Sequence, residues 1–162
     1  MAVHDNNEIM RRMINILILN GPNLSALGSR EPDIYGRETL SDIMNQVRHH
    51  GKSLSVHIED FQSNDEGDLV SRILNSRNKF DGIIFNPAAY THTSVALRDA
   101  LQSIQIPCVE VHLSNTAARE KIRHSSLTAC ACLGQIMGFG ALSYKLALTG
   151  LVEYLSSGRA GK

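Results

Sequence analysis

The sequence has few cysteines, no excess of charge of either sign, and no apolar run long enough to cross a bilayer. Its three cysteines form no regular framework, which argues against a disulfide-stapled secreted domain. Sixteen basic residues balance sixteen acidic ones, so no net field attracts nucleic acid or an anionic membrane. Cys130 and Cys132 are spaced C-x-C with no second pair to complete a zinc site, and we expect small buried hydrophobic residues there.

The N-terminus is polar and lacks the apolar core of a signal peptide. A length of 162 residues suits one domain with a proper core. We therefore expect a cytoplasmic protein with a loose N-terminal extension over 1–13, a single catalytic α/β domain over 14–157 and a short tail over 158–162.

Apolar runs and helical stripes alternate along the chain. The runs at 14–19, "INILIL", and 82–86, "GIIFN", predict strands buried on both faces. Further strands are predicted over 53–60, nearer a sheet edge, 107–114 and 129–138, and helices over 38–51, 66–78, 93–104, capped by Ser94 or Thr93, and 141–155. This alternation predicts a flavodoxin-like, doubly wound parallel sheet of about five strands with helices on both faces.

Polar side chains of unusual kinds gather where the ligand of such a sheet binds, outside the carboxyl ends of the strands. These residues are Asn20, Asn23, Arg30 and Tyr35 after the first strand, Gln62, Ser63 and Asn64 after the second, Asn86, Tyr90, Thr91 and His92 after the third, and Glu110, His112, Ser114, Asn115, Arg119 and Arg123 at and after the fourth. Amides and hydroxyls suit a polyhydroxylated small molecule, and arginines suit a carboxylate.

Each of these residues also has a purely structural interpretation. Asn23 can tolerate a turn conformation, and His92 can lie in a helix cap. Glu110 and His112 share one strand face and can satisfy each other, although two ionisable groups there cost stability unless they are used. A metal site from His92, His112 and Glu110 is a weak alternative, since no stretch has metal-ligand spacing. The segment "GPNLSALG" has neither the lysine of a Walker phosphate-binding loop nor the G-x-G-x-x-G spacing of a dinucleotide-binding loop.

Several irregular motifs carry a resemblance to a known family: "LNGPNL…G.REP.IYG", "FQSN.EG", "NPAAYTHTSVALRDAL", "EVHLSN…RE..RH" and "GFGA..Y.LAL". From about Ile14 to the last helix, the chain closely resembles type II 3-dehydroquinate dehydratases. The resemblance implies a flavodoxin-like lyase of the shikimate pathway that eliminates water from 3-dehydroquinate to give 3-dehydroshikimate through an enolate. Aromatic amino acid biosynthesis and catabolism of quinate both stay open as its role. It also implies no cofactor or metal, and a homododecamer of four trimers. Ala117 and Asp65 stand where relatives commonly have histidine.

The same resemblance implies roles for individual residues. Tyr35 matches the base that removes the proton beside the ketone, Arg30 the arginine that lowers the pKa of this tyrosine, and Asn23 the amide that helps position a water. His112 matches the general acid for the departing hydroxyl, with Glu110 orienting it. The matched binding positions are Asn86, His92, Leu113, Ser114, Arg123 and, reaching the neighbouring subunit's site, Asp99.

The residue types agree with this chemistry. A free phenol with a pKa of about 10 is a poor base at neutral pH, and a neighbouring guanidinium lowers that pKa by about a unit or more. The other route to this product uses a lysine Schiff base, and of the five lysines only Lys121 lies in a rim loop. Two other classes stay open: a flavin-binding electron carrier, although "GPNLSALG" offers one serine where a hydroxyl-rich phosphate loop is needed, and a ligand-binding domain without turnover.

Overall fold

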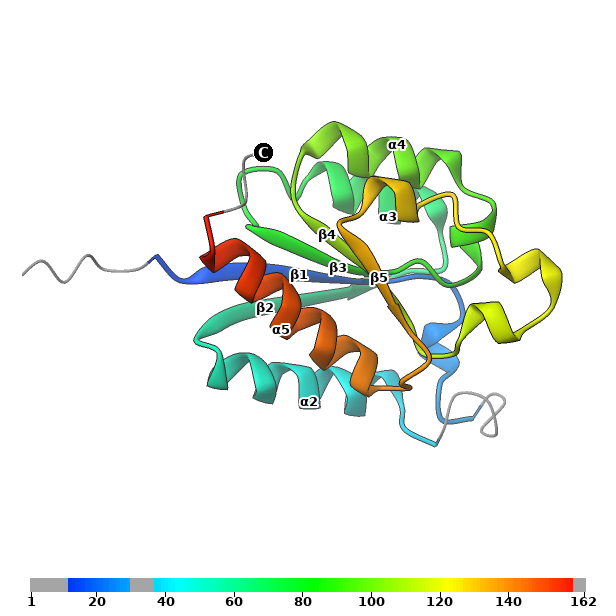
Figure 1. Ribbon diagram of the computed structural model, residues 1–162, viewed down its shortest axis with the longest axis horizontal. Helices are drawn as coiled ribbons and strands as arrows, with labels where there is room; N and C mark the ends of the chain where they lie inside the picture. Colours follow the sequence, from blue (N-terminus) through cyan, green and yellow to red (C-terminus); the bar gives the residue numbers. More distant parts are fainter. Residues whose placement is uncertain (1–11, 30–36, 159–162) are drawn as a thin grey trace, which may run out of the picture.

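The computed structural model describes residues 12–29 and 37–158, and it places a parallel sheet between two layers of helices (Figure 1). The strands are β1 (Ile14–Asn20), β2 (Val56–Gln62), β3 (Gly82–Asn86), β4 (Cys108–His112) and β5 (Gly134–Met137). They pair in the order β2-β1-β3-β4-β5, and every pairing is parallel. The predicted doubly wound, flavodoxin-like fold is therefore confirmed, and β2 does lie at a sheet edge.

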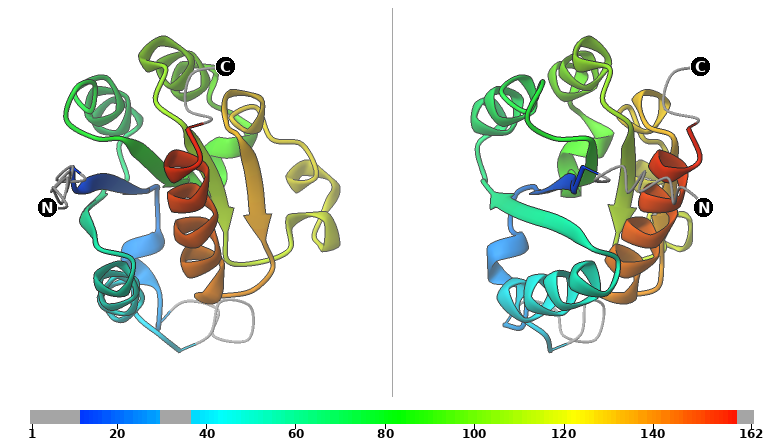
Figure 2. Two further views of the ribbon diagram at one scale, coloured as in Figure 1. Left: turned by 60° about the vertical axis from the view of Figure 1, so that its left-hand side comes forward. Right: turned by 90° about the vertical axis from the view of Figure 1, so that its left-hand side faces the viewer.

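Helices cover both faces of the sheet (Figures 1 and 2). These are α2 (Leu40–Ser53) and α5 (Leu142–Ser156) on one face, and α3 (Glu66–Leu74) and α4 (Val95–Ile104) on the other. In β1, Ile16 and Ile18 belong to the core under α2 and α5, whereas Leu17 and Leu19 belong to the core under α3 and α4. This two-sided burial explains why β1 is almost wholly apolar. Among the described residues, no helix has the length and apolar character needed to cross a membrane.

Local contacts explain two features of the helix boundaries. Ser94, one of the two predicted caps, begins α4: its Oγ accepts a hydrogen bond from the Leu97 backbone N–H at 2.9 Å. Gly51, predicted to end α2, instead lies within it. A Cβ at this position would lie 2.4 Å from Ile58 Cδ1, so glycine here allows α2 to pack closely on β2.

The segment 129–138 departs from the prediction of one continuous strand. Only β5 is extended, and Ala129–Ala131 forms a 3-10 turn. The turn is stabilised by Ser126, whose Oγ accepts from the Ala129 N–H at 2.9 Å. A short apolar run does not distinguish a strand from a helical turn, and here a local side-chain contact decides it.

The three cysteines differ in their environments. Cys108 is buried in β4, Cys132 is half-buried, and Cys130 is exposed on the 3-10 turn. The prediction of small buried residues in the C-x-C pair is therefore wrong for Cys130, because the turn carries it to the surface.

The predicted domain limits are not tested by the structure. Most of the predicted extension at 1–13 and of the tail at 158–162 lies outside the described residues. The limits therefore stay predictions, although all the described helices and strands fall between 14 and 156.

Candidate active site

A pocket opens at the carboxyl ends of β1, β3 and β4. The chain passes from β1 to β2 on one side and then to β3 on the other side of β1. The loops after β1 and β3 therefore leave the sheet in different directions and open a crevice between them, which is where ligands bind in this class of fold. The predicted position of the site is thus a real hollow in the structure.

Most of the predicted site residues meet in this pocket. Those that line it are Asn23, Asn86, His92, His112, Leu113, Ser114 and Arg123. Asp99 does not: it lies on α4 with 59% of its side chain exposed and pairs with Arg98. Arg30 and Tyr35 lie outside the described residues, so their roles stay predictions.

Glu110 and His112 are bonded to each other directly. His112 Nε2 lies 2.7 Å from Glu110 Oε1, and both side chains are buried at the end of β4. An ionised carboxylate only accepts hydrogen bonds, so Nε2 carries the proton in this contact. Nδ1 is consequently the ring nitrogen of His112 that is not bound to Glu110.

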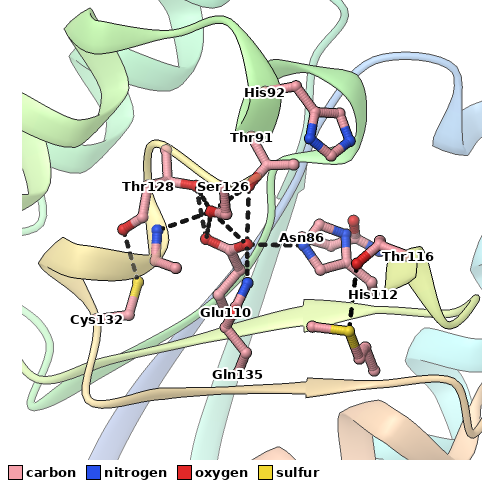
Figure 3. Close-up of polar contacts among 12 residues, drawn as sticks. Asn86, Thr91, His92, Glu110, His112, Thr116, Ser126, Thr128, Cys132 and Gln135 are labelled. Atoms are coloured by element: carbon pink, nitrogen blue, oxygen red, sulfur yellow. Dashed lines mark hydrogen bonds and ion pairs between the residues drawn. The ribbon is translucent and has the colours of Figure 1, made fainter. Parts of the chain in front are cut away.

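The Glu110 carboxylate is completely buried and accepts hydrogen bonds from four further side chains (Figure 3). The donors are Thr91 Oγ1 at 2.8 Å, Ser126 Oγ at 3.0 Å, Thr128 Oγ1 at 2.5 Å and Gln135 Nε2 at 2.7 Å. Burial by itself raises the pKa of Glu110, but the hydrogen bonds from His112, Thr128 and Thr91, with the charge of His112, outweigh it and lower the pKa to about 2. The carboxylate is therefore charged at any physiological pH and holds the His112 ring at its Nε2 edge.

The low pKa of Glu110 predicts a pH-dependent contribution to stability. The pKa of Glu110 falls from its ordinary value of 4.5 to about 2 in the folded protein. While the carboxylate is ionised, this difference adds about 3 kcal/mol to the free energy of unfolding. This contribution is fully present above about pH 4.5 and is lost as the pH falls toward about 2. Glu110→Gln should therefore unfold at a lower urea concentration than the unchanged protein at pH 7, and the difference should shrink with falling pH.

Urea unfolding of both proteins between pH 7 and pH 2.5 measures this effect. Glu153→Gln on the exposed side of α5 is the matched control, and it should behave as the unchanged protein at every pH. A difference between Glu110→Gln and the unchanged protein that stays constant down to pH 2.5 would show that charge on Glu110 is not what stabilises the fold.

Asn23 has both the structural role and the site position considered for it. Its backbone is left-handed, with φ of 65°, a conformation that asparagine tolerates well. Its N–H donates to Asn64 Oδ1 at 2.9 Å, and Gln62 Nε2 donates to the same oxygen at 3.1 Å. Gln62 and Asn64, at and just after the end of β2, thus do not line the pocket. They support the loop that presents Asn23 to it.

His92 and Asn86 form the wall that follows β3. The ring of His92 is oriented by its Nδ1, which lies 2.7 Å from the Ser125 carbonyl oxygen and donates to it. Nε2 is then the nitrogen left for a ligand. Asn86 is almost fully buried and is held by two hydrogen bonds, from the Ala88 N–H to Oδ1 and from Nδ2 to Tyr144.

Two guanidinium groups give the pocket its positive charge. Arg119 and Arg123 both line it, and both pair with the exposed carboxylate of Glu120, at 3.6 Å and 2.6 Å. The hydrogen bond from Arg123 lowers the pKa of Glu120, so this carboxylate is ionised at neutral pH. A bound carboxylate would compete with Glu120 for Arg123. Because the Glu120 side chain is exposed at the rim, water can hydrate it when Arg123 turns to the ligand.

Sequence reasoning missed part of the lining. The pocket also contains Leu24, Leu27, Ala88, Ala89 and Thr116, and Arg119 was identified only as a rim residue. Leu24 and Leu27 lie in and beside a short 3-10 turn after β1, where they close the pocket against the core. No polar signal marks such residues in a sequence. Only their apolar character within a polar loop hints at a position facing inward.

The side chains weighed as a metal set have other partners. Glu110 is surrounded by donors, and His92 binds a carbonyl oxygen through Nδ1. In the part of the chain that the structure describes, no group of three or more histidine, cysteine or carboxylate side chains is placed to hold a metal ion.

Comparisons with known proteins agree with the geometry. A model of the family "Dehydroquinase class II" matches residues 14–152. A 3-dehydroquinate dehydratase of Synechocystis sp. is 52% identical over 91% of this chain and 97% of its own length, and one of Jannaschia sp. is 50% identical over 91% and 99%. The crystal structure of a type II dehydroquinase from Butyrivibrio crossotus superposes with a TM-score of 0.84 at 45% identity, covering 86% of this chain and 97% of that one. The chain therefore belongs to the class II dehydroquinase family, as its motifs predict, and is an enzyme of the hydro-lyase class.

Proposed function

We propose that this protein eliminates water from 3-dehydroquinate to give 3-dehydroshikimate through an enolate, with a tyrosine base and a histidine acid. The observation that carries this proposal is the pocket itself. There His112, backed by the charged carboxylate of Glu110, faces the same space as Asn23 and two arginines. An acid, an amide and cations around one hollow suit the loss of hydroxide from a carboxylate-bearing β-hydroxy ketone.

The reaction begins at the carbon beside the ketone. Tyr35, as phenolate, removes a proton from that carbon, and the electron pair moves onto the ketone oxygen to form the enolate. Arg30 favours the phenolate by its charge. Asn23 helps to hold a water against the developing enolate oxygen, and its exposed position at the pocket mouth supports this role.

The reaction ends with loss of the hydroxyl group. The enolate collapses, the bond from carbon to the hydroxyl oxygen breaks, and His112 gives that oxygen a proton, so that water leaves. Glu110 keeps the imidazole ring in place and stabilises its protonated form. Tyr35 then holds the proton taken in the first step; Tyr35 releases that proton and His112 takes one up, which returns both groups to their starting states.

Substrate binding is assigned to the remaining pocket residues. Arg123 is suited to the carboxylate of the substrate, and Asn86, His92 and Ser114 are suited to its hydroxyl groups, with Leu113 beside them. No lysine among the described residues lines this pocket, which favours the enolate route over an imine.

Ultraviolet spectroscopy tests the proposal directly, because the product is a conjugated enone and the substrate is not. Purified protein mixed with 3-dehydroquinate should produce a rising enone absorbance, and borohydride added with substrate should leave the activity intact. No rise in absorbance, with substrate bound, would instead indicate a binding domain without turnover. Inactivation by borohydride only in the presence of substrate would indicate a lysine imine.

We further propose that the enzyme works in the cytoplasm, in the shikimate pathway, as a dodecamer of four trimers. The family resemblance supports this assembly, and so do large apolar side chains at the surface: Phe139 is 62% exposed and Leu142 is 49% exposed. The exposed position of Asp99 on α4, away from its own pocket, suits a contact with a neighbouring subunit's site. Light scattering that gave the mass of one chain would contradict the dodecamer.

A further inference from the structure

Tyr144 is a fully buried tyrosine on α5 that does not line the pocket, yet both hydrogen bonds of its hydroxyl reach the edge of the site. Its Oη donates to Asn20 Oδ1 at 2.6 Å and accepts from Asn86 Nδ2 at 2.9 Å. Asn20 and Asn86 are the last residues of β1 and β3 and face each other in the sheet register. The phenol therefore bridges the two strands whose diverging loops open the pocket.

The direction of each hydrogen bond in this cluster is determined. The Ala88 backbone N–H can only donate, and it lies 3.2 Å from Asn86 Oδ1, so the amide oxygen of Asn86 faces Ala88. The amide nitrogen then faces Tyr144 and must donate to it. The single proton of the hydroxyl is left for Asn20 Oδ1, and burial, which raises the pKa of this phenol, keeps that proton in place.

This arrangement leaves Asn86 with one N–H that neither partner uses. The side chain has two amide protons, and Tyr144 takes one of them. Because Asn86 lines the pocket, the second is the donor that it can offer to a ligand. Without the hydroxyl of Tyr144, the amide would be held only through its oxygen and could rotate out of this orientation.

We propose that Tyr144 is a positioning residue for substrate binding: it fixes the Asn86 amide so that an N–H is directed at an oxygen of the substrate. The proposal rests on the proposed function, since it assigns Asn86 to the binding of 3-dehydroquinate. It adds a residue from α5, which is far from the pocket loops in sequence and contributes nothing to the pocket wall.

Tyr144→Phe tests this role, because it keeps the buried ring and removes only the hydroxyl. Loss of an orientation worth one neutral hydrogen bond should raise KM for 3-dehydroquinate by about fivefold. The value of kcat at saturating substrate should stay within about twofold of the unchanged enzyme, because the proton-transfer groups are untouched. Tyr154→Phe, a half-buried tyrosine on the same helix away from the pocket, is the control and should leave both constants unchanged.

A double-mutant cycle with Asn86→Ala separates positioning from a general effect on the fold. If Tyr144 acts through Asn86, adding Tyr144→Phe to Asn86→Ala should not raise KM further. Urea unfolding, run in parallel, reports the structural cost of removing the hydroxyl, which should be smaller in the Asn86→Ala background because the hydrogen bond between the two side chains is already absent there.

The outcomes are distinct. An unchanged KM in Tyr144→Phe, or an equal rise in KM with and without Asn86, would overturn the role of Tyr144 while leaving the dehydratase activity standing. A fall in kcat that follows the loss of folded protein, with no change in KM, would do the same. If the protein without any substitution did not convert 3-dehydroquinate, the proposed function would be overturned, and this inference with it.

Discussion

His112→Ala is expected to lower kcat by about a thousandfold while the protein stays folded. General acid catalysis by a positioned side chain contributes roughly 10²- to 10⁴-fold, and a departing hydroxide without a proton donor is a poor leaving group. His112 is 6% exposed at the end of β4, so its truncation removes the proposed acid and opens a small space beside the pocket. The ultraviolet enone assay, at saturating 3-dehydroquinate, measures the loss.

The structure supplies a control for this variant. His57 lies exposed on the edge strand β2, away from the pocket, and His57→Ala should retain full activity. If His112→Ala kept more than about a tenth of the kcat of the unchanged enzyme, the acid would have to be another group. His92, whose Nε2 is free of the Ser125 carbonyl, would then be the next residue to change.

Tyr35→Phe is the second variant with a large expected effect. Removal of the phenol oxygen takes away the proposed base, so kcat should fall by about a thousandfold or more while KM changes little. The assay is the same, and circular dichroism with light scattering checks that fold and assembly are unchanged. A fully active Tyr35→Phe enzyme would remove this residue from the mechanism.

Arg30→Gln is the matched companion, because it distinguishes a missing base from a base that is not ionised. Without the guanidinium, the pKa of Tyr35 should return toward the ordinary value of about 10. Activity of Arg30→Gln should then be low at neutral pH and recover in part as the pH is raised. Activity of Tyr35→Phe should stay low at every pH, and recovery there would contradict the assignment of the base.

Much of the fold follows from local patterns in the sequence. The two-sided apolar run of β1 and the five residues of β3 were predicted at or within one residue of their limits, because a short, almost wholly apolar run is the pattern of a strand buried on both faces. The helices follow from apolar stripes at helical spacing. The strand predicted over 129–138 shows the limit of this approach, since the contact of Ser126 with the Ala129 N–H makes a turn that hydrophobicity does not reveal.

The candidate site was predicted from residue types at the correct edge of the sheet, and the structure adds their connections. Asn23 illustrates the difference. Its left-handed backbone and its pocket position coexist, so the structural interpretation of "GPN" is confirmed and the catalytic role of Asn23 stays a prediction. Spacing does not separate the two interpretations, because one residue has both the turn conformation and the position at the pocket.

The sequence by itself determined the order of strands and helices along the chain, the placement of the candidate site at the carboxyl ends of the strands, and the family. These are properties of local periodicity and of motifs within single segments. Only the tertiary structure decided how Glu110 stays charged without solvent and how Tyr144 joins Asn20 to Asn86. Such contacts link groups up to 124 residues apart, and they form only after the sheet has brought the ends of its strands together.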